Sequence, residues 1–452
     1  MSFRISPSSI KTGFKVFLLI FIIALLIKVL FNFSITNVIF FFGESLDADA
    51  YGHTNVLVLG IGGGEHQGPD LTDTMIIVSL DEKNKSAVMF SVPRDLYVDD
   101  GKIWKGKINT VYAAAKAHYK DSTRGLEELR SITEKTLNVP IQYYIKVNFS
   151  GFEKAIDSLG GVDIYVDQAI SDPFYPNDKT DGYNPFYIEQ GWHHMNGSTA
   201  LKYARSRQTT SVYDRDKRQQ KLILALKEKV IKNGEINENK VKDILFSLKN
   251  DVETNLTVRQ IITLAKIGKD IDQSLIKSYE MHDDPSKCGG WLYPYLAQDG
   301  YGGNVLMPAG DKYDKVQNLT NIVINNSLLL NESVKLQILN GTPRAAAAKL
   351  KSMLTRYCFN IVKFGNAKSN TVQKTTYYIK NKVDKNFVYM LQKFIPGSIL
   401  AEVPIEYTIA PYGSDADVII EVGADYWLRP LEDPYDFIIL PPQRAEGAPP
   451  KK

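Results

Sequence analysis

The chain has 452 residues, of which 44% are hydrophobic and 23% are charged, a balance typical of a globular protein with two or three domains. Its formal net charge is only +3, which excludes a protein that binds polyanions through its overall charge. Its two cysteines, Cys288 and Cys358, exclude a disulfide framework and lack the spacing of a zinc site. They can pair in an oxidising compartment, and the sequence leaves open whether they do.

The N-terminus predicts a membrane anchor. Residues 1–15 contain basic residues and no acidic one, so we expect them to stay in the cytoplasm. An apolar segment follows over 16–42, long enough for the roughly 20 residues that cross a bilayer. The alternative is a cleaved signal peptide, because "ADA" at 48–50 resembles a cleavage site, but the apolar segment is longer than such peptides usually have. We expect an uncleaved single-pass anchor in the cell membrane, with everything after it outside the cytoplasm.

The first part of the exported chain predicts an α/β domain, which we place at 50–315. The segment "TNVLVLGI" reads as a buried strand that runs into a glycine-rich loop, and "LEELRSITEKTL" has apolar residues at helical spacing. A further helix should begin with Ser150 as its N-cap and stop at Gly160. The alternation of predicted strands and helices along the chain favours an αβα sandwich with a mixed central sheet. Strands are predicted over 54–61, 74–80, 86–92, 141–147 and 162–166, and helices over 121–136, 214–232 and 257–267.

The remaining segments differ in composition. Residues 168–195 are rich in Asp, Pro, Gly and aromatic residues, which is more typical of a functional flap than of a spacer. Residues 316–333 predict a linker. The segment 334–425, with an Ala-rich helix at 344–356 between two strands, predicts a small α/β domain. The Pro-rich end, 441–452, predicts a disordered tail.

Two aspartates follow the glycine-rich loop at 60–70. The loop lacks the GK[ST] ending of a P-loop and a strand follows it, so we do not expect nucleotide binding. Asp70 and Asp73 then stand at the mouth of the next strand. Such residues are often turn formers. Two carboxylates beside exposed backbone can also hold Mg²⁺ together with phosphate oxygens of a substrate. Both interpretations remain open on these residues alone.

The segment "SVPRDLYV" places Arg94 and Asp95 at the end of a strand, where open α/β sheets bind ligands. A surface ion pair is the plainer interpretation of the same two residues. Lys107, in "KGKINTVYAAA", comes just before a helix and has simple solvation as its alternative. These residues are therefore candidates for a polar site at one edge of the sheet.

The stretch "ALKYARSRQTTSVYDRDKRQQ" at 200–220 is rich in Lys and Arg. One helix should carry Arg205 and Arg207 near its end, and a second should start with Asp214 as N-cap. On the second helix, Arg215, Arg218 and Gln219 share one face, which continues below as an apolar stripe.

A face that passes from arginine to hydrocarbon suits a phosphate or pyrophosphate attached to a lipid. Guanidinium groups match phosphate oxygens in pairs, and a helix N-terminus adds its own donors. Nucleic acid is excluded by the compartment and by the near-neutral total charge. Hydrolase motifs such as G-x-S-x-G and H-E-x-x-H are missing from the sequence. The pattern therefore indicates transfer of a group already activated by pyrophosphate, where catalysis is mostly positioning and charge neutralisation.

At these residues the chain resembles the LytR–CpsA–Psr family of bacterial cell-envelope proteins. The resemblance extends over about 54–232 and rests on an ordered series of motifs. The segment 334–422, with "VKLQILNGT", "FNIVKFGNA" and "ADVIIEVG", resembles the LytR C-terminal domain that accompanies many members. The motifs, in order, are "NVLVLGI", "TDTM", "SVPRDLYV", "KIN", "NFSGFEKAIDSLGGVDIYV", "HHMNGSTALKYARSR" and "DRDKRQQ".

The resemblance implies an α/β sandwich with a tunnel that accepts a polyprenyl chain. Members take an anionic glycopolymer from a polyprenyl-pyrophosphate carrier and attach it to a peptidoglycan sugar hydroxyl as a phosphodiester, with Mg²⁺. By position, Asp73 matches the metal-associated aspartate and Arg94 matches the arginine of the P-R-D motif. Arg205, Arg207 and Arg215 match the arginines that bind the pyrophosphate.

The other candidates fall on weaker positions. Lys107 and Gln219 match less regular family positions, and Arg218 joins the pyrophosphate set through its helix face. Asp95 and a metal-bound water are the two candidates to assist deprotonation of the acceptor hydroxyl. Many members have a second acidic residue after the first strand where this chain has Ile61–Gly62, and Asp70 and Glu65 are the two candidates to replace it at the metal.

Two alternatives to the phosphotransferase remain at this point. One is a non-catalytic sensor or scaffold that binds polyprenyl phosphates through the same tunnel. The other is a pyrophosphatase that acts on the lipid carrier.

Overall fold

The computed structural model describes residues 44–64, 66, 68–101, 104–177, 182–206, 212–232, 247–296, 304–330, 333–400 and 402–432. The predicted cytoplasmic segment 1–15, the anchor 16–42, the tail 441–452, Glu65 and Arg207 lie outside these residues. Within them, no helix combines the length and hydropathy that crossing a membrane requires.

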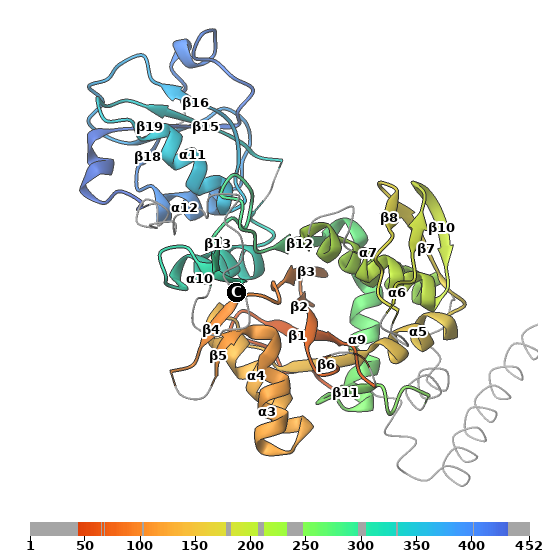
Figure 1. Cartoon of the computed structure of the whole chain (residues 1–452). Coiled ribbons are helices and arrows are strands. Elements are labelled where there is room, and N and C mark those ends of the chain that lie inside the picture. Colours follow the sequence, from red (N-terminus) through yellow and green to blue (C-terminus); the bar gives the residue numbers. More distant parts are fainter. Residues whose placement is uncertain are drawn as a thin grey trace, which may run out of the picture.

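A six-stranded mixed sheet forms the centre of the first domain (Figure 1). β1 pairs with β6 in parallel and with β2 in antiparallel, and β3 pairs with β12 in parallel. Four strands therefore end at the same edge of the sheet, and β2 begins there. In spatial order the strands are β11 (Val252–Thr254), β6 (Tyr143–Asn148), β1 (His53–Ile61), β2 (Thr72–Asp81), β3 (Ser86–Ser91) and β12 (Ile276–Glu280).

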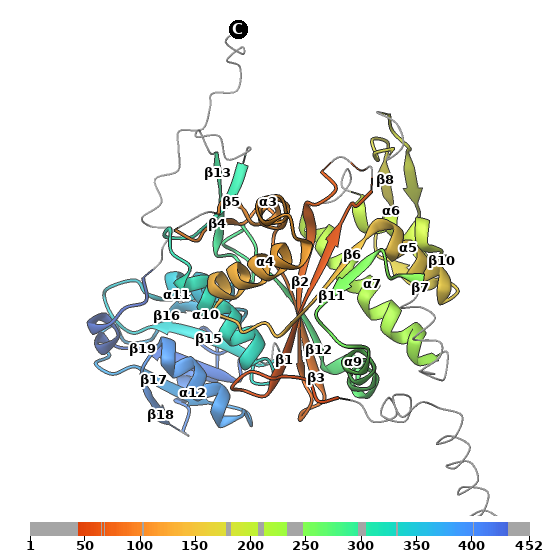
Figure 2. The same cartoon turned by 90° about the horizontal axis from the view of Figure 1, so that it is seen from below.

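Helices cover both faces of this sheet, as the predicted αβα sandwich requires (Figure 2). α3 (Val111–Tyr119) and α4 (Ser122–Leu137) pack on one face, and α7 (Val212–Lys232) and α9 (Val258–Asp270) lie on the other. Strand side chains alternate between the faces. Leu57 and Leu59 join the core beneath α3 and α4, whereas Val56 packs toward α9. The sheet is therefore apolar on both sides, which explains the continuous hydrophobic run of β1.

The segment between β6 and α7 forms a smaller layer beside the sheet. The predicted N-cap of α5, Ser150, is wrong by two residues: Asn148 caps this helix by accepting from the Gly151 amide at 2.7 Å. Asn196 caps α6 in the same way, through the Thr199 amide at 2.9 Å. The predicted N-cap of α7, Asp214, is also wrong: the helix begins at Val212, and Asp214 lies in its first turn. The elements are α5 (Phe149–Ser158), β7 (Val162–Val166), β8 (Ile170–Asp172), β9 (Phe186–Ile188), β10 (Gly191–Met195) and α6 (Gly197–Arg205).

The predicted linker at 316–333 is wrong. Residues Asp314–Thr320 form α10, and a further helical turn follows over Asn321–Asn325. Val316, Leu319 and Val323 are fully buried, because this helix packs against both domains. A solvated linker would not hold so many apolar side chains. Before it come β4 (Tyr97–Asp99), β5 (Lys105–Lys107), β13 (Leu292–Leu296) and β14 (Asn304–Pro308).

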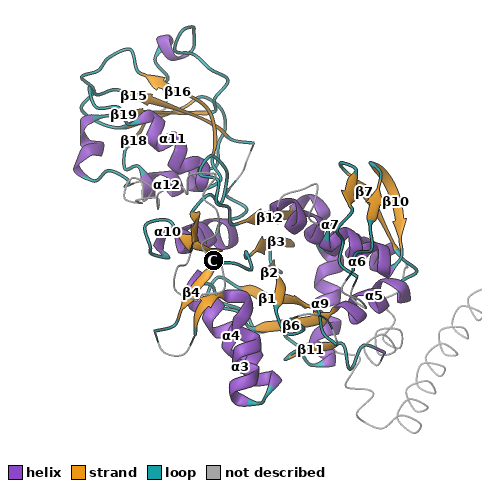
Figure 3. Cartoon of the chain, in the orientation of Figure 1, coloured by secondary structure: helices purple, strands orange, loops and turns teal. Residues whose placement is uncertain are grey.

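The second domain contains the predicted small α/β unit (Figure 3). Its sheet has the order β16-β15-β19-β17-β18, and β15 is parallel to both of its neighbours. α11 and α12 pack on one face, where Leu336, Ile338 and Ile420 are fully buried. The elements are β15 (Lys335–Asn340), α11 (Ala347–Arg356), β16 (Asn360–Asn366), β17 (Thr376–Ile379), α12 (Lys385–Phe394), β18 (Ser398–Leu400) and β19 (Val418–Val422).

The two domains are joined covalently and by packing. Cys288 and Cys358 form a disulfide, which decides the pairing that the sequence left open. Next to it, the rings of Trp291 and Tyr357 lie 4.5 Å apart, and Arg356 Nε donates to the Pro285 carbonyl at 3.0 Å. The hydrophobic core is continuous across the junction. The second domain is therefore held against the first.

Candidate functional site

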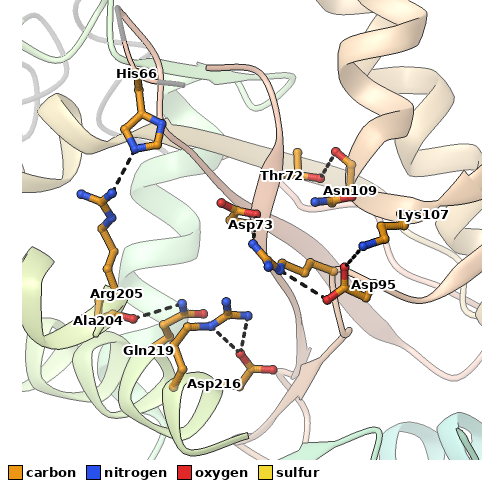
Figure 4. Close-up of polar contacts among 12 residues, drawn as sticks. His66, Thr72, Asp73, Asp95, Lys107, Asn109, Ala204, Arg205, Asp216 and Gln219 are labelled. Atoms are coloured by element: carbon orange, nitrogen blue, oxygen red, sulfur yellow. Dashed lines mark hydrogen bonds and ion pairs between the residues drawn. The ribbon is translucent and has the colours of Figure 1, made fainter. Parts of the chain in front are cut away.

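Four charged side chains of alternating sign form a chain at the edge where β2 begins and β3 ends (Figure 4). Arg94 donates to Asp73 Oδ1 at 2.7 Å, and its Nε lies 3.5 Å from Asp95 Oδ2. Lys107 Nζ lies 2.8 Å from the other oxygen of Asp95. The structure thus brings together Asp73, Arg94, Asp95 and Lys107, which the sequence analysis selected separately.

The charge of Arg94 is stabilised by its neighbours. Burial on its own lowers the pKa of Arg94, but the charges of Asp73 and Asp95 and their hydrogen bonds outweigh it and raise this pKa above the usual value. The side chain remains about a quarter exposed. Arg94 is therefore a permanent cation that faces solvent at the sheet edge.

Backbone hydrogen bonds fix the loop that carries this chain of charges. The Asn109 amide donates to the Arg94 carbonyl at 3.2 Å, and the Thr72 hydroxyl donates to the Asn109 carbonyl at 3.3 Å. Asn109 is buried, and its side-chain oxygen has no hydrogen-bond partner among the described residues. These contacts tie the start of β2 to the turn after Lys107.

Arg205, the last residue of α6, is held in an aromatic clamp. Its guanidinium carbon lies 4.1 Å from the centre of the Phe149 ring and 5.2 Å from that of Tyr175. Nη1 donates to the Tyr175 hydroxyl at 3.0 Å, and Nη2 lies 3.0 Å from His66 Nε2 (Figure 4). Because a guanidinium only donates, the His66 nitrogen accepts. The clamp fixes one orientation of this cation.

The start of α7 carries a second basic group that is buried. Arg215 donates to Asp216 Oδ1 from Nε at 3.3 Å and from Nη2 at 3.1 Å. Burial raises the pKa of Asp216, while the nearby charges of Arg215, Arg94 and Arg218 counteract it. Gln220 Nε2 of α7 donates to Ser91 Oγ, at the end of β3, at 2.9 Å, so the start of α7 lies next to the sheet edge that carries the chain of charges. Gln219 Nε2 lies 3.5 Å from the Ala204 carbonyl, a long hydrogen bond.

Arg218 has contacts of a different kind. It is only 6% exposed, and its Nε donates to the Tyr203 carbonyl at 2.8 Å while Nη2 donates to the Ser206 carbonyl. These carbonyls belong to the last turn of α6, where backbone acceptors have no partner within the helix. Arg218 thus joins the end of α6 to α7, a structural role that differs from the pyrophosphate contact expected for it.

An apolar cavity of about 370 Å³ lies below the start of α7, between the sheet and α7 and α9. Strand residues such as Val58, Val78 and Met89 line its sheet side, and Ile223 and Leu226 line its helix side. Since Ile223 follows Arg215 by about two turns, a single helix connects the basic group to the cavity. This arrangement agrees with the predicted passage from arginine to hydrocarbon.

The carboxylate of Asp70 is paired with a lysine outside the chain of charges. Both of its oxygens accept from Lys116 Nζ, at 2.8 and 2.7 Å, on the side of α3. Among the described residues, no group of three or more His, Cys, Asp or Glu side chains is arranged to hold a metal ion. Asp73 is the acidic candidate whose side chain is joined to the chain of charges and is still 30% exposed.

Several residues of this site were missed in the sequence. His66 and Tyr175 orient Arg205, Phe149 stacks on it, and Asp216 balances Arg215. His66 lies in the glycine-rich loop and Tyr175 in the aromatic segment 168–195, so the aromatic composition was the one available signal. Their contacts join residues far apart along the chain, which no local pattern reveals.

Comparisons with known proteins identify relatives of this chain. The LytR_cpsA_psr family model matches residues 36–304. The polyisoprenyl-teichoic acid–peptidoglycan teichoic acid transferase TagV of Bacillus subtilis (strain 168) is 32% identical over 227 residues, which are 48% of this chain and 54% of TagV. The TagU transferase of Bacillus mycoides (strain KBAB4) is 30% identical over 252 residues, 54% of this chain and 74% of TagU. This chain therefore spans about half the length of the first relative.

Among solved structures, the crystal structure of Bacillus subtilis TagV aligns with a TM-score of 0.47 and 25% identity, over 61% of this chain and 99% of TagV. The family match covers more than half of the chain and includes the sheet edge, α6 and α7. The chain belongs to the LytR_cpsA_psr family.

Proposed function

We propose that the chain is a membrane-anchored phosphotransferase. It moves a glycopolymer from a polyprenyl-pyrophosphate carrier to a sugar hydroxyl of peptidoglycan and leaves a phosphodiester. The names of the two transferase relatives support this class of reaction. The observation that carries the proposal is the continuity of α7, whose first turns carry Arg215 beside the charged sheet edge and whose later turns line the apolar cavity.

The donor has two chemically different parts, and the site has a surface for each. The polyprenyl chain enters the apolar cavity, whose lining from β1, β2, α7 and α9 removes hydrocarbon from water. The pyrophosphate lies against Arg94 and Arg205, with Arg215 behind them. Arg207, which lies outside the described residues, is the fourth member of this set. Lys107 and Gln219 complete the polar rim.

The transfer needs no covalent enzyme intermediate. The acceptor hydroxyl oxygen attacks the phosphorus that carries the glycan, and the bond from this phosphorus to the bridging oxygen breaks. Polyprenyl phosphate leaves with the bond electrons, and the acceptor is joined to the glycan by a phosphodiester. Asp95 accepts the proton of the hydroxyl, since its carboxylate lies at the same edge between Lys107 and Arg94.

The arginines lower the barrier by neutralising charge. Negative charge increases on the bridging oxygen as the bond breaks, and cations already fixed in place stabilise it without rearrangement. The aromatic clamp around Arg205 and the ion pairs of Arg94 provide this fixed orientation.

Asp73 is the residue that would hold Mg²⁺. Its partly exposed carboxylate fits a cation that takes one or two carboxylates together with phosphate oxygens of the substrate. When bound, the ion supplies further neutralisation of the pyrophosphate charge. Asp70 does not fit this role, because Lys116 occupies both of its oxygens.

Two features support a position outside the cytoplasm. The Cys288–Cys358 disulfide belongs to an oxidising environment. The apolar segment 16–42 is the proposed anchor, preceded by a basic cytoplasmic segment. Together they support a position of the sheet edge on the outer face of the membrane, where lipid-linked glycan and peptidoglycan meet.

A reconstituted transfer assay tests the proposal. Full-length protein in lipid nanodiscs is incubated with Mg²⁺, a polyprenyl-pyrophosphate-linked saccharide and peptidoglycan fragments, and the product is analysed by mass spectrometry. We expect a phosphodiester-linked product. Arg205→Ala should reduce the rate about 10²- to 10³-fold. Arg124→Ala, an exposed arginine of α4 in the same domain, is the matched control and should retain the wild-type rate.

The other outcomes identify the competing functions. Release of free phosphate without transfer would indicate a pyrophosphatase. Binding of the lipid carrier without turnover would indicate a sensor or scaffold. Wild-type turnover by Arg205→Ala would show that the site is wrongly assigned.

A further inference from the structure

The second domain has a cleft of its own. A hollow of about 1040 Å³ lies at the face of the second sheet that α11 and α12 leave uncovered. It is bordered by the ends of β15 and β16, the loop after β16, and the segment around Pro404 and Tyr407. Ligand clefts in open α/β sheets usually lie outside the carboxyl ends of parallel strands. This cleft occupies that position.

A buried carboxylate forms the floor of the cleft. Glu421 of β19 is 7% exposed, and its two oxygens accept from the hydroxyls of Tyr378, at 2.8 Å, and Tyr407. Burial and the nearby Glu421 raise the pKa of both tyrosines, so these hydroxyls remain protonated donors. Because both donors are neutral, they satisfy the carboxylate without cancelling its charge. The cleft therefore has a negative floor framed by two aromatic rings.

Amide and hydroxyl groups form the rim. Asn340 and Asn366 are paired at the carboxyl ends of β15 and β16, and Asn340 Nδ2 donates to the Thr342 carbonyl at 2.8 Å. Asn366, Ser369 and Asn370 are exposed along the cleft. This rim offers many neutral donors and acceptors at fixed positions.

The charged residues of the rim exclude one class of ligand. Lys368 Nζ lies 3.7 Å from Glu406 Oε1, so the lysine is already balanced by a carboxylate. With Glu421 on the floor, a phosphate-rich polymer would meet repulsion. A neutral polyhydroxylated ligand suits the cleft better, since its hydroxyls can donate to Glu421 and accept from the asparagine amides.

We propose that this cleft binds an uncharged, polyhydroxylated oligosaccharide. The further claim that this saccharide is the acceptor glycan rests on the proposed function. The claim that the cleft binds a saccharide rests on the cleft alone. The disulfide and the shared core hold the cleft at a fixed place relative to the arginines. A glycan strand bound there has a raised effective concentration at the sheet edge.

Saccharide binding by the cleft is tested by calorimetric titration of the full-length protein in nanodiscs with the tetramer of N-acetylglucosamine. We expect saturable binding that Asn366→Ala weakens about tenfold or more, because polar contacts at the rim are lost. Glu421→Gln should weaken it at least as much. Tyr389→Ala, an exposed tyrosine of α12, is the control and should bind like wild type. Thermal unfolding checks that each variant is folded, and the exposed position of Asn366 protects the test from misfolding.

Three results would overturn the proposal: no binding of the tetramer to wild type, equal affinity of Asn366→Ala and wild type, or stronger binding of poly(glycerol phosphate) than of the tetramer. The outcome is independent of transfer. Arg205→Ala should bind the tetramer normally while failing to transfer, and Asn366→Ala should raise the KM for peptidoglycan fragments without lowering kcat. Tetramer binding in a protein without transferase activity would leave the cleft assigned and reject the proposed reaction.

Discussion

The two sheets of this protein carry polar sites of opposite charge at equivalent positions. At the carboxyl ends of the central strands, Arg94 and Arg205 are oriented by acidic and aromatic neighbours. In the second domain, Glu421 is oriented by two tyrosines instead. Topology selects the sheet edge as the place for a ligand in both cases. The side chains found there are the basis for proposing an anionic ligand at the first site and a neutral ligand at the second.

The largest effect should come from breaking the link between the two regions. Replacement of Cys288 and Cys358 by serine opens a loop of 70 residues. The chain-entropy model of disulfides predicts a loss of about 4 kcal/mol in the free energy of unfolding. Urea unfolding of the variant, compared with oxidised and reduced wild type, measures it. If the variant unfolds at the same urea concentration as oxidised wild type, packing alone joins the domains.

A second test separates two arginines that look alike in the sequence. Arg218→Ala removes a buried guanidinium from the carbonyls of Tyr203 and Ser206 and should lower the free energy of unfolding by about 2–3 kcal/mol. Arg205→Ala should change stability by less than about 1 kcal/mol, because Arg205 is itself partly exposed, as are His66 and Phe149. Denaturant unfolding of both variants provides the comparison. Equal destabilisation would contradict the distinction between a structural and a ligand-binding arginine.

The third test compares two buried carboxyl groups. Unlike Glu421, Glu280 at the end of β12 has an oxygen without a hydrogen-bond partner among the described residues. Burial raises the pKa of Glu280 from 4.5 to about 7, against the opposing effect of Lys217, 3.7 Å away. The folded state therefore favours the protonated form. The contribution of Glu280 to the free energy of unfolding is therefore complete below pH 4.5. It is lost as the pH rises through about 7.

The free energy of unfolding of Glu280→Gln should consequently equal that of wild type at low pH and be larger at high pH. At pH 8 the gain in the free energy of unfolding should be on the order of 1–3 kcal/mol, since the variant avoids a buried charge. Urea unfolding across this pH range, with Glu82→Gln on an exposed turn as the control, measures the difference. Parallel pH profiles of Glu280→Gln and wild type would refute the prediction.

The smallest stability effect concerns the cavity of the first domain, which is apolar, whereas the cleft of the second domain is polar. Gly268 of α9 lines it, and a Cβ at this position would meet no atom within 4 Å. Gly268→Ala should therefore stabilise the helix by about 0.5–1 kcal/mol and leave transfer intact.

Gly268→Phe should instead fill the cavity. We expect the KM for a long-chain polyprenyl donor to rise about tenfold, with little change for a short-chain donor. Steady-state kinetics with both donors are the measurement. An equal change for both would show that the cavity does not hold the lipid chain.

The sequence alone determined the layers of the fold and most members of the site. Continuous apolar runs identify β1 and β2, and helical spacing of apolar residues identifies α4 and α7. Arg94 and Asp95 could be placed because they directly follow a recognisable strand. The motifs of the family resemblance supplied Asp73, Arg205 and Arg215, although the linker at 316–333 was misjudged for lack of a local signal.

Only the tertiary structure decided how these residues are used. Arg205 and His66 are 139 residues apart, and Arg218 finds its carbonyl partners on a different helix. The pairing of Cys288 with Cys358 and the burial of Glu421 likewise depend on packing between distant segments. Local patterns report the preferences of neighbouring residues, whereas burial and long-range hydrogen bonds arise only when whole elements are packed together.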